Sequence, residues 1–268
     1  MSNDHRRRAG PAGTVRSNRW HVAARLVLIS VGAAAMAWAA SVAPTFWQQS
    51  RYDQLADRMV NGAVFDIETL RRLLPTAATV ESSEWAATPA GLRSIAITRL
   101  AVAEEALGAG DREHVDSDLA ALDSAITRSL SQSPADPFLW LGAFWSRNLQ
   151  GGFGTDSLPL LRMSYALGPR EGWIAIKRNR VALALFPQLP PDLKEDTLQE
   201  FAALVASGIY EQAADILTGP GWPVRERLLE RLESVDYRER QRFASVLAQG
   251  GYDVTVPGVE AIPQRPWR

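Results

Sequence analysis

An uncharged apolar stretch near the N-terminus dominates the hydrophobic pattern of the chain. Leu26 to Ala43 reads LVLISVGAAAMAWAASVA, eighteen residues without a charge. As a helix rising 1.5 Å per residue, it is about 27 Å long, close to the roughly 30 Å hydrocarbon core of a bilayer. Trp20 and Trp47 flank it where indole rings favour the membrane interface. The pattern predicts a single transmembrane anchor over residues 26–47.

The arginines that precede this stretch predict its orientation. Residues 1–25 contain six arginines and one acidic residue, Asp4. The positive-inside rule keeps such a basic tail in the cytoplasm. We therefore expect a single-pass protein of the bacterial inner membrane, with residues 1–25 cytoplasmic and the C-terminal domain periplasmic.

A cleaved signal peptide is the alternative interpretation of the same stretch. Ala37-Trp38-Ala39 fits the small-residue pattern that precedes a signal-peptidase cut. However, apolar character continues past Ala39, and Pro44 directly follows the other candidate, Ser41-Val42-Ala43, where it would hinder cleavage. We favour the uncleaved anchor, and both interpretations place the body outside the cytoplasm.

Beyond the anchor, apolar residues recur at spacings of three and four, which predicts a succession of amphipathic helices. Glycine and proline separate them, and Thr88-Pro89 combines a cap residue with proline at the first helical position. Together they predict an all-α domain over residues 48–250. Helices are expected over residues 53–74, 89–107, 111–130, 137–150, 158–167, 171–186, 190–205, 210–217, 224–234 and 236–249, with a loop or weak helix over 76–88.

Residues 251–268 are expected to form an extended, proline-containing tail. Tyr252–Val256 is the one strand candidate of the chain, and a single strand cannot make a sheet. The prolines and Trp267 suit docking onto the surface of another protein.

Parts of the body repeat at a spacing typical of helical hairpins. Ser133-Pro134 before an aromatic helix recurs as Gly168-Pro169 before Trp173, a spacing of 35 residues between the prolines. Ser207–Ala214 places a glycine between two helices, followed by tyrosine and paired small residues. These features resemble tetratricopeptide repeats (TPR), with a period of about 34 residues, over residues 90–220. The resemblance implies a TPR-like α-α superhelix that binds a protein partner in a groove, without catalysis. An irregular helical domain is the alternative.

The overall layout is also similar to that of membrane-anchored helical accessory proteins of bacterial envelope and exopolysaccharide systems. This second resemblance implies a non-enzymatic scaffold or accessory role, with polysaccharide machinery among the expected partners. An envelope enzyme that acts on glycan or peptidoglycan is the alternative function.

Composition narrows the chemistry further. The chain has no cysteine, which excludes disulfides, thiolate metal sites and a cysteine nucleophile. Residues 26–268 carry 23 basic and 29 acidic residues, a net charge of −6, which makes a poor nucleic-acid binder. Asp111, His114, Asp116 and Asp118 spread over most of a helix circumference, so we reject them as a metal site. We expect no catalytic residue, no metal and no cofactor.

The candidate partner-binding residues lie on the helices predicted over 137–150 and 171–186, the first helices of successive hairpins. Aromatic and basic side chains dominate interface hot spots, and these two helices hold both kinds. Lys177 and Arg180 are three residues apart and share one helix face. A solvated basic face without a partner is the alternative interpretation. The predicted set is Trp140, Trp145, Trp173, Lys177, Arg178 and Arg180.

Overall fold

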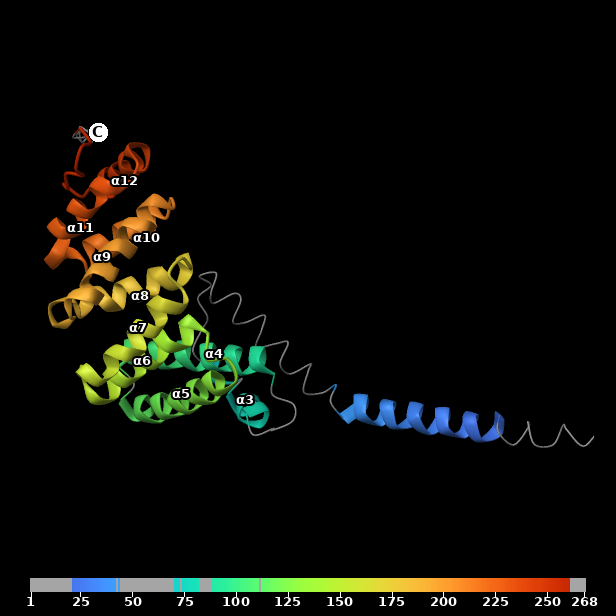
Figure 1. Ribbon diagram of the computed structural model, residues 1–268. Helices are drawn as coiled ribbons and strands as arrows, with labels where there is room; N and C mark the ends of the chain where they lie inside the picture. The colour runs from blue at the N-terminus through green and yellow to red at the C-terminus, as the bar shows by residue number, and fades with distance from the viewer. Residues whose placement is uncertain are drawn as a thin grey trace, which may run out of the picture.

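The computed structural model describes residues 21–41, 43, 70–72, 74–81, 88–110 and 112–260. The first described element is a helix over His21–Ser41, and it stands apart from the helical body (Figure 1). It begins five residues before the predicted stretch and is long and apolar enough to cross a membrane. At 21 residues its length is about 32 Å, which matches the hydrocarbon core better than the predicted eighteen. Trp20 and Trp47 lie outside the described residues.

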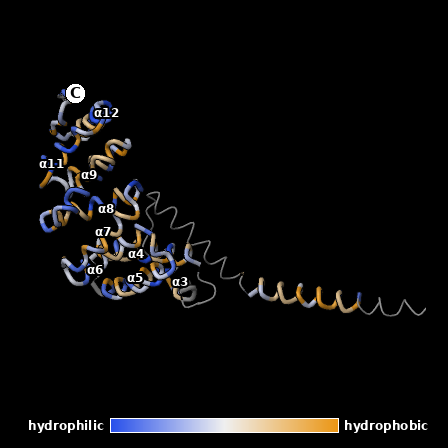
Figure 2. Tube along the Cα trace, viewed as in Figure 1, coloured by the Kyte–Doolittle hydropathy of each residue, from blue (hydrophilic) through white to orange (hydrophobic). Residues whose placement is uncertain are grey.

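No side chain of this helix is buried in the molecule. Figure 2 shows its middle as a run of apolar residues, and the leucine, isoleucine and tryptophan side chains along it are all exposed. An isolated helix with apolar residues on every side needs a lipid or protein environment to cover it.

The rest of the described chain is helical, and no strand occurs in the parts that the structure describes. The predicted all-α class is therefore confirmed. Four short 3-10 helices, over Thr155–Ser157, Phe186–Gln188, Trp222–Val224 and Leu232–Ser234, interrupt or join the longer ones. The α-helices are α3 (Leu74–Glu81), α4 (Pro89–Gly108), α5 (Arg112–Gln132), α6 (Pro137–Gly151), α7 (Leu158–Leu167), α8 (Gly172–Ala184), α9 (Pro191–Ala206), α10 (Tyr210–Thr218), α11 (Arg225–Arg231) and α12 (Tyr237–Gln249).

The predicted helix starts are explained by capping. Thr88 accepts a hydrogen bond from the Gly91 N–H and precedes Pro89 at the start of α4. Asp136 accepts from the N–H groups of Phe138 and Leu139 and precedes Pro137 at the start of α6. Each cap satisfies N–H groups that have no partner within the helix, and proline suits the first turn because it has no N–H.

The segment around Pro75 differs from the prediction. Leu74–Glu81 is a helix, α3, where the sequence left a choice between a loop and a weak helix. Pro75 occupies its second position, so the proline opens this helix, whereas the helical residues 70–71 before it already give way to a turn at Arg72. Most of the predicted helix over 53–74 lies outside the described residues.

Successive helices pack as neighbouring pairs along the array. Helix α4 packs on α5, α6 on α7, and α8 on α9, each joined by a short connection, and α5 also packs on α6. In addition, α4 contacts α6, α6 contacts α8, and α8 contacts α10. Figure 1 shows the result as a stack that progresses from α3 at one end of the body to α12 at the other.

Among the described residues, two hydrophobic clusters account for most of the buried apolar side chains, and α8 contributes to both. The first cluster lies among α4, α5, α6 and α7 and includes Ile174 and Ala182 of α8 and Leu193 of α9. The second lies among α9, α10, α11 and α12 and includes Ala175 and Leu183 of α8. Helix α8 is therefore shared between the two halves of the body.

The C-terminal segment packs against its own domain. Residues 252–260 form no strand; Val256 is 2% exposed and belongs to the second hydrophobic cluster, with Val254 and Val259 packed beside it. The Tyr252 N–H donates to the Leu247 carbonyl, and Arg240 donates to the Pro257 carbonyl, so the segment runs back along α12. Residues 252–260 of the predicted extended tail therefore dock on the domain through their valines; residues 261–268, with Trp267, lie outside the described part.

Candidate functional site

Helix α8 carries four of the six predicted partner-binding residues. With 3.6 residues per turn, Trp173, Lys177 and Arg180 fall within about 60° of one another around the axis, whereas Arg178 lies about 140° from Trp173. The Lys177 and Arg180 side chains are 43% and 45% exposed, and Arg178 is 0% exposed. The inclusion of Arg178 in an accessible basic cluster is therefore wrong: its helix position turns it into the interior.

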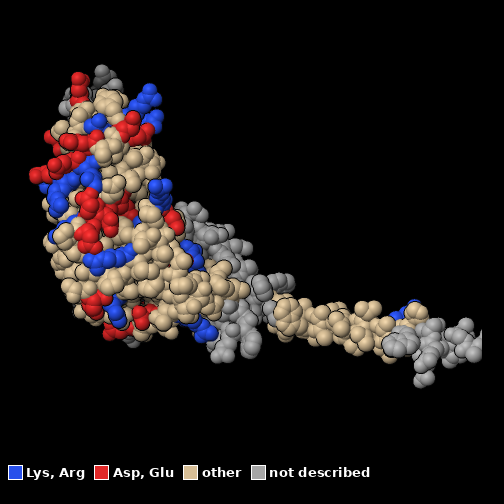
Figure 3. Space-filling view, viewed as in Figure 1, with Lys and Arg blue, Asp and Glu red and all other residues tan. Residues whose placement is uncertain are grey.

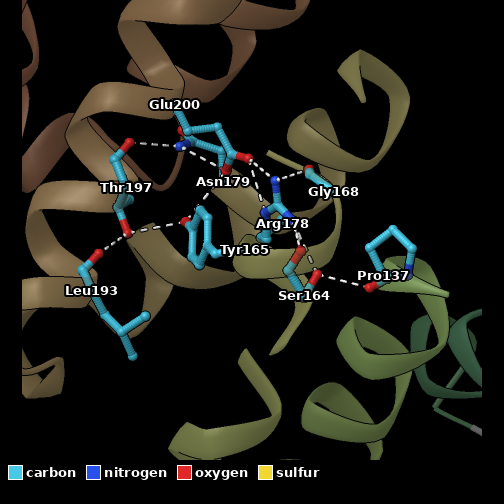
Figure 4. Close-up of polar contacts among 9 residues, drawn as sticks. All are labelled: Pro137, Ser164, Tyr165, Gly168, Arg178, Asn179, Leu193, Thr197 and Glu200. Carbon is cyan, nitrogen blue, oxygen red and sulfur yellow. Dashed lines mark hydrogen bonds and ion pairs between the residues drawn. The ribbon is translucent and has the colours of Figure 1, made fainter. Parts of the chain in front are cut away.

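The guanidinium of Arg178 is fully hydrogen-bonded inside the protein (Figure 4). Its Nε and Nη2 donate to Glu200 Oε1 on α9 at 2.9 and 2.5 Å. Its Nη1 donates to the Ser164 carbonyl at 2.6 Å and to Ser164 Oγ at 3.1 Å, and Nη2 also donates to the Gly168 carbonyl at 2.9 Å. These five bonds match the five N–H donors of an arginine side chain.

The two carbonyls that Arg178 reaches lie at the C-terminal end of α7. The Gly168 carbonyl, at the C-cap, has no partner within the helix, whereas the Ser164 carbonyl also accepts from the Gly168 N–H. Both lie at the negative end of the helix dipole, where a cation is favoured. The Ser164 hydroxyl donates in turn to the Pro137 carbonyl in the first turn of α6 at 2.8 Å. One side chain of α8 is thus linked to α6, α7 and α9.

Glu200 is the acidic centre of this network. Besides Arg178, it accepts from Tyr165 Oη at 3.3 Å and from Asn179 Nδ2 at 3.4 Å through Oε2. Asn179 and Thr197 are joined through the Thr197 carbonyl at 2.8 Å. Burial raises the pKa of Glu200 above 4.5, and the charge and hydrogen bonds of Arg178 oppose that rise.

Tyr165 closes the network on the side of α7. Its ring lies under the Arg178 guanidinium at 4.2 Å, a cation–π distance, and its hydroxyl lies 3.3 Å from Thr197 Oγ1. Burial, with the nearby negative charge of Glu200, raises the pKa of Tyr165 well above 10. We call the six residues Ser164, Tyr165, Arg178, Asn179, Thr197 and Glu200 the junction network.

The exposed cations of α8 each face an acidic side chain on a neighbouring helix. Lys177 Nζ lies 3.6 Å from Glu104 Oε2 on α4, and Arg180 Nη2 lies 3.5 Å from Asp215 Oδ2 on α10. The predicted basic cluster is therefore balanced by acids in three dimensions. Figure 3 likewise shows basic and acidic side chains interspersed over the visible face of the body.

Trp173 lies beside the start of α6. Its ring is 4.8 Å from that of Phe138 with a tilt of 43°, and the Arg93 guanidinium lies 5.7 Å from its centre. Arg93 also pairs with Asp136, the cap of α6, at 2.5 Å. Trp173 is half-buried, so one part of the indole packs inward while another reaches the surface.

The two tryptophans of α6 are also half-buried. Trp140 donates from Nε1 to the Pro134 carbonyl at 2.8 Å, which ties the loop before α6 to the helix. Trp145 packs against the first hydrophobic cluster. Both side chains therefore have structural contacts within the domain.

We call Trp173, Lys177 and Arg180, with the paired acids Glu104 and Asp215, the α8 face. It brings together three of the six predicted residues, while Arg178 belongs to the interior. The sequence analysis missed the junction network, although a signal was present: Arg178 lies four residues from Ile174 and from Ala182, on the inward stripe of α8. Glu200 lies on the stripe of α9 that carries Leu193 and Leu204.

Among the described residues, no group of three or more histidine, aspartate and glutamate side chains could hold a metal ion. His114 is exposed on α5. Comparisons of the chain with protein-family models, with curated proteins and with solved structures found no match.

Proposed function

We propose that this chain is a non-enzymatic, single-pass scaffold or accessory protein of a bacterial envelope assembly, with polysaccharide synthesis or export as the first system to test. The observation that carries the proposal is the exposed apolar helix over His21–Ser41 ahead of an all-helical body. Such a helix needs a membrane or a partner to cover it. The six arginines of residues 1–25 favour a cytoplasmic N-terminus and a periplasmic body.

The packing of the body supports a TPR-like arrangement within this proposal. Helices α4, α6, α8 and α10 contact one another in chain order, and α5, α7 and α9 each pair with the helix before them. Arrays of helical hairpins present the first helices of successive pairs as one extended face. The α8 face lies on such a first helix, and we propose that it binds a protein partner.

The chemistry of the α8 face favours a protein over an anionic polymer. Its cations are paired with Glu104 and Asp215, so it lacks the uncompensated positive charge that attracts polyanions. A half-buried tryptophan flanked by ion pairs is the composition of an interface hot spot with a polar rim.

Two measurements test this proposal in cells. A reporter that is active only outside the cytoplasm, fused after Arg268, should be active, and the protein should remain in the membrane fraction at high salt. A silent reporter would overturn the orientation. A photocrosslinker at Lys177 or Arg180 should then give a discrete adduct with an envelope protein, which the same probe at the well-exposed Glu226 of α11 should not give. Equal products at all three positions would overturn the binding face.

A further inference from the structure

We infer that Arg178 and Glu200 are positioning residues: they fix how the α8–α9 hairpin is set against the α6–α7 hairpin, and thereby set the geometry of the α8 face. This inference rests on the proposed function only in naming that face as a binding surface. The way in which the α8–α9 hairpin is set against the α6–α7 hairpin is a property of this chain without any partner.

Arg178 and Glu200 lie where the two halves of the body meet. The first hydrophobic cluster ends, and the second begins, along α8, which contributes Ile174 to one and Ala175 to the other. Arg178 and Glu200 lie at this boundary and are 0% and 7% exposed. Apolar contacts are non-directional and tolerate sliding, whereas a buried polar layer is satisfied in one arrangement.

The hydrogen bonds of Arg178 also fix the direction of its side chain. A guanidinium is a rigid planar fork, so its five hydrogen bonds constrain rotation as well as distance. Arg178 directs two of them to Glu200 Oε1 on α9, two to Ser164 on α7 and one to Gly168 beyond α7. Rotation of α8 about its own axis breaks these bonds together.

The orientation of Arg178 also determines how the exposed side chains of α8 are presented. Lys177 is the residue before Arg178, and Arg180 is two residues after it. The rotational position of Arg178 around the α8 axis therefore determines where both cations point. Their partners, Glu104 and Asp215, stand on α4 and α10, on opposite sides of α8 along the stack. A small rotation of α8 therefore changes both ion pairs and the exposed edge of Trp173.

The test uses an apolar replacement of the pair, Arg178→Met with Glu200→Leu. Replacing both members of a buried ion pair with apolar residues of similar volume often leaves a protein folded and as stable. Circular dichroism and cooperative unfolding should match those of the parent protein. The chain has no native cysteine, so introduced cysteines at exposed positions accept spin labels without a background.

One labelled pair reports the angle between the hairpins, and a second serves as its control. Labels at Arg147 of α6 and Ala203 of α9 span the junction, whereas labels at Ser124 of α5 and Arg147 stay within the first half; all three positions are exposed. In the full chain the 147–203 distance distribution should be narrow. In the apolar double variant it should broaden or shift, while the 124–147 distribution stays unchanged.

An unchanged 147–203 distribution in a folded double variant would overturn the positioning role. If that variant does not fold, Arg178→Lys replaces it: lysine keeps the charge but not the fork, so the distribution should still broaden, and an unchanged one would overturn the inference equally. Photocrosslinking at Lys177 should be lost in whichever variant has a broadened 147–203 distance distribution. If crosslinking is absent already in the parent protein while the distances respond as expected, the proposed binding face fails and the positioning role stands.

Discussion

The rings of Phe138 and Trp173 meet at 4.8 Å with a tilt of 43°, across the contact between α6 and α8. Phe138 is buried in the second position of α6, and Trp173 is half-buried in the second position of α8. The first turns of two successive hairpins are therefore in direct contact. Tilted aromatic pairs at this distance contribute about 0.5–1.5 kcal/mol beyond the area that they bury.

Trp173→Ala should consequently weaken the fold as well as any interface. We expect a loss of about 2 kcal/mol in the free energy of unfolding, below the 3–5 kcal/mol of a fully buried tryptophan because the indole is half-exposed. Trp173→Phe, which keeps a ring against Phe138, should lose less than half as much. Urea denaturation measures both, and equal losses would show that the ring contact contributes little.

Substitutions at Arg178 and Glu200 should change the free energy of unfolding in a strongly non-additive way. Arg178→Met alone leaves Glu200 buried without its counter-charge, and we expect a loss of about 3–5 kcal/mol in the free energy of unfolding. Adding Glu200→Leu should recover most of that loss. Chemical denaturation of the two single variants and the double variant forms a double-mutant cycle, and additive losses would contradict a direct coupling.

Exchanging an exposed ion pair separates binding from stability. Arg180→Asp with Asp215→Arg keeps an attractive pair between α8 and α10 but inverts its polarity toward a partner. Exposed pairs contribute little, so the free energy of unfolding should stay within about 0.5 kcal/mol of the parent value. Crosslinking from Lys177 should fall roughly tenfold, equivalent to about 1.4 kcal/mol.

The same exchange at Arg162 and Asp192, an exposed pair between α7 and α9, is the matched control. It should change neither the free energy of unfolding nor the crosslinking. If both exchanges reduce crosslinking equally, the effect is one of general surface charge and not of the α8 face.

The raised pKa of Tyr165 predicts a loss of stability at alkaline pH. Its pKa is raised in the folded state, so the folded protein holds the phenolic proton more tightly than the unfolded chain does. The resulting stability is fully present below pH 10 and falls as the pH rises above 10, by up to about 1.4 kcal/mol per pH unit.

Tyr165→Phe removes this titration and leaves the ring in place. The difference in free energy of unfolding between the parent protein and the variant should therefore be constant from pH 7 to 9 and shrink above pH 10. Denaturation at several alkaline pH values measures it. A difference that stays constant to pH 11 would show that the phenol ionises as readily in the folded protein as in the unfolded chain.

The C-terminal segment should stabilise the last helices. Val256→Ala removes buried methyl groups from the second hydrophobic cluster and should cost about 2 kcal/mol of the free energy of unfolding. The neighbouring exposed residue provides the control: Thr255→Ala should change the free energy of unfolding by less than about 0.5 kcal/mol. Hydrogen exchange should show faster exchange in α12 for the first variant only.

Much of the fold was predictable because local signals agree with one another. Thr88-Pro89 and Asp136-Pro137 are strong starts, and the structure begins α4 and α6 there. The helices predicted over residues 190–205 and 236–249 match α9 and α12 within two residues. The predicted site residues were harder to place, because charge and aromatic character do not show which side of a helix faces inward.

Arg178 illustrates this limit. Lys177 and Arg180, which were predicted to share a basic surface with Arg178, form exposed ion pairs, and composition alone did not separate the three. The burial of Arg178 depends on Glu200, which lies 22 residues later on another helix. Such a long-range complement becomes visible only when the packing of the hairpins is known, and the same holds for the docking of Val256 on α12.

The return of residues 252–259 along α12 also bears on how the molecule can associate with copies of itself. An array of stacked helices whose last layer is uncovered can add another array at that end and grow into a filament. Here Val256 fills the last layer, so the C-terminal end of the stack is closed by the chain itself. A second array that adds at this end would have to displace Val256 and, with it, part of the second hydrophobic cluster.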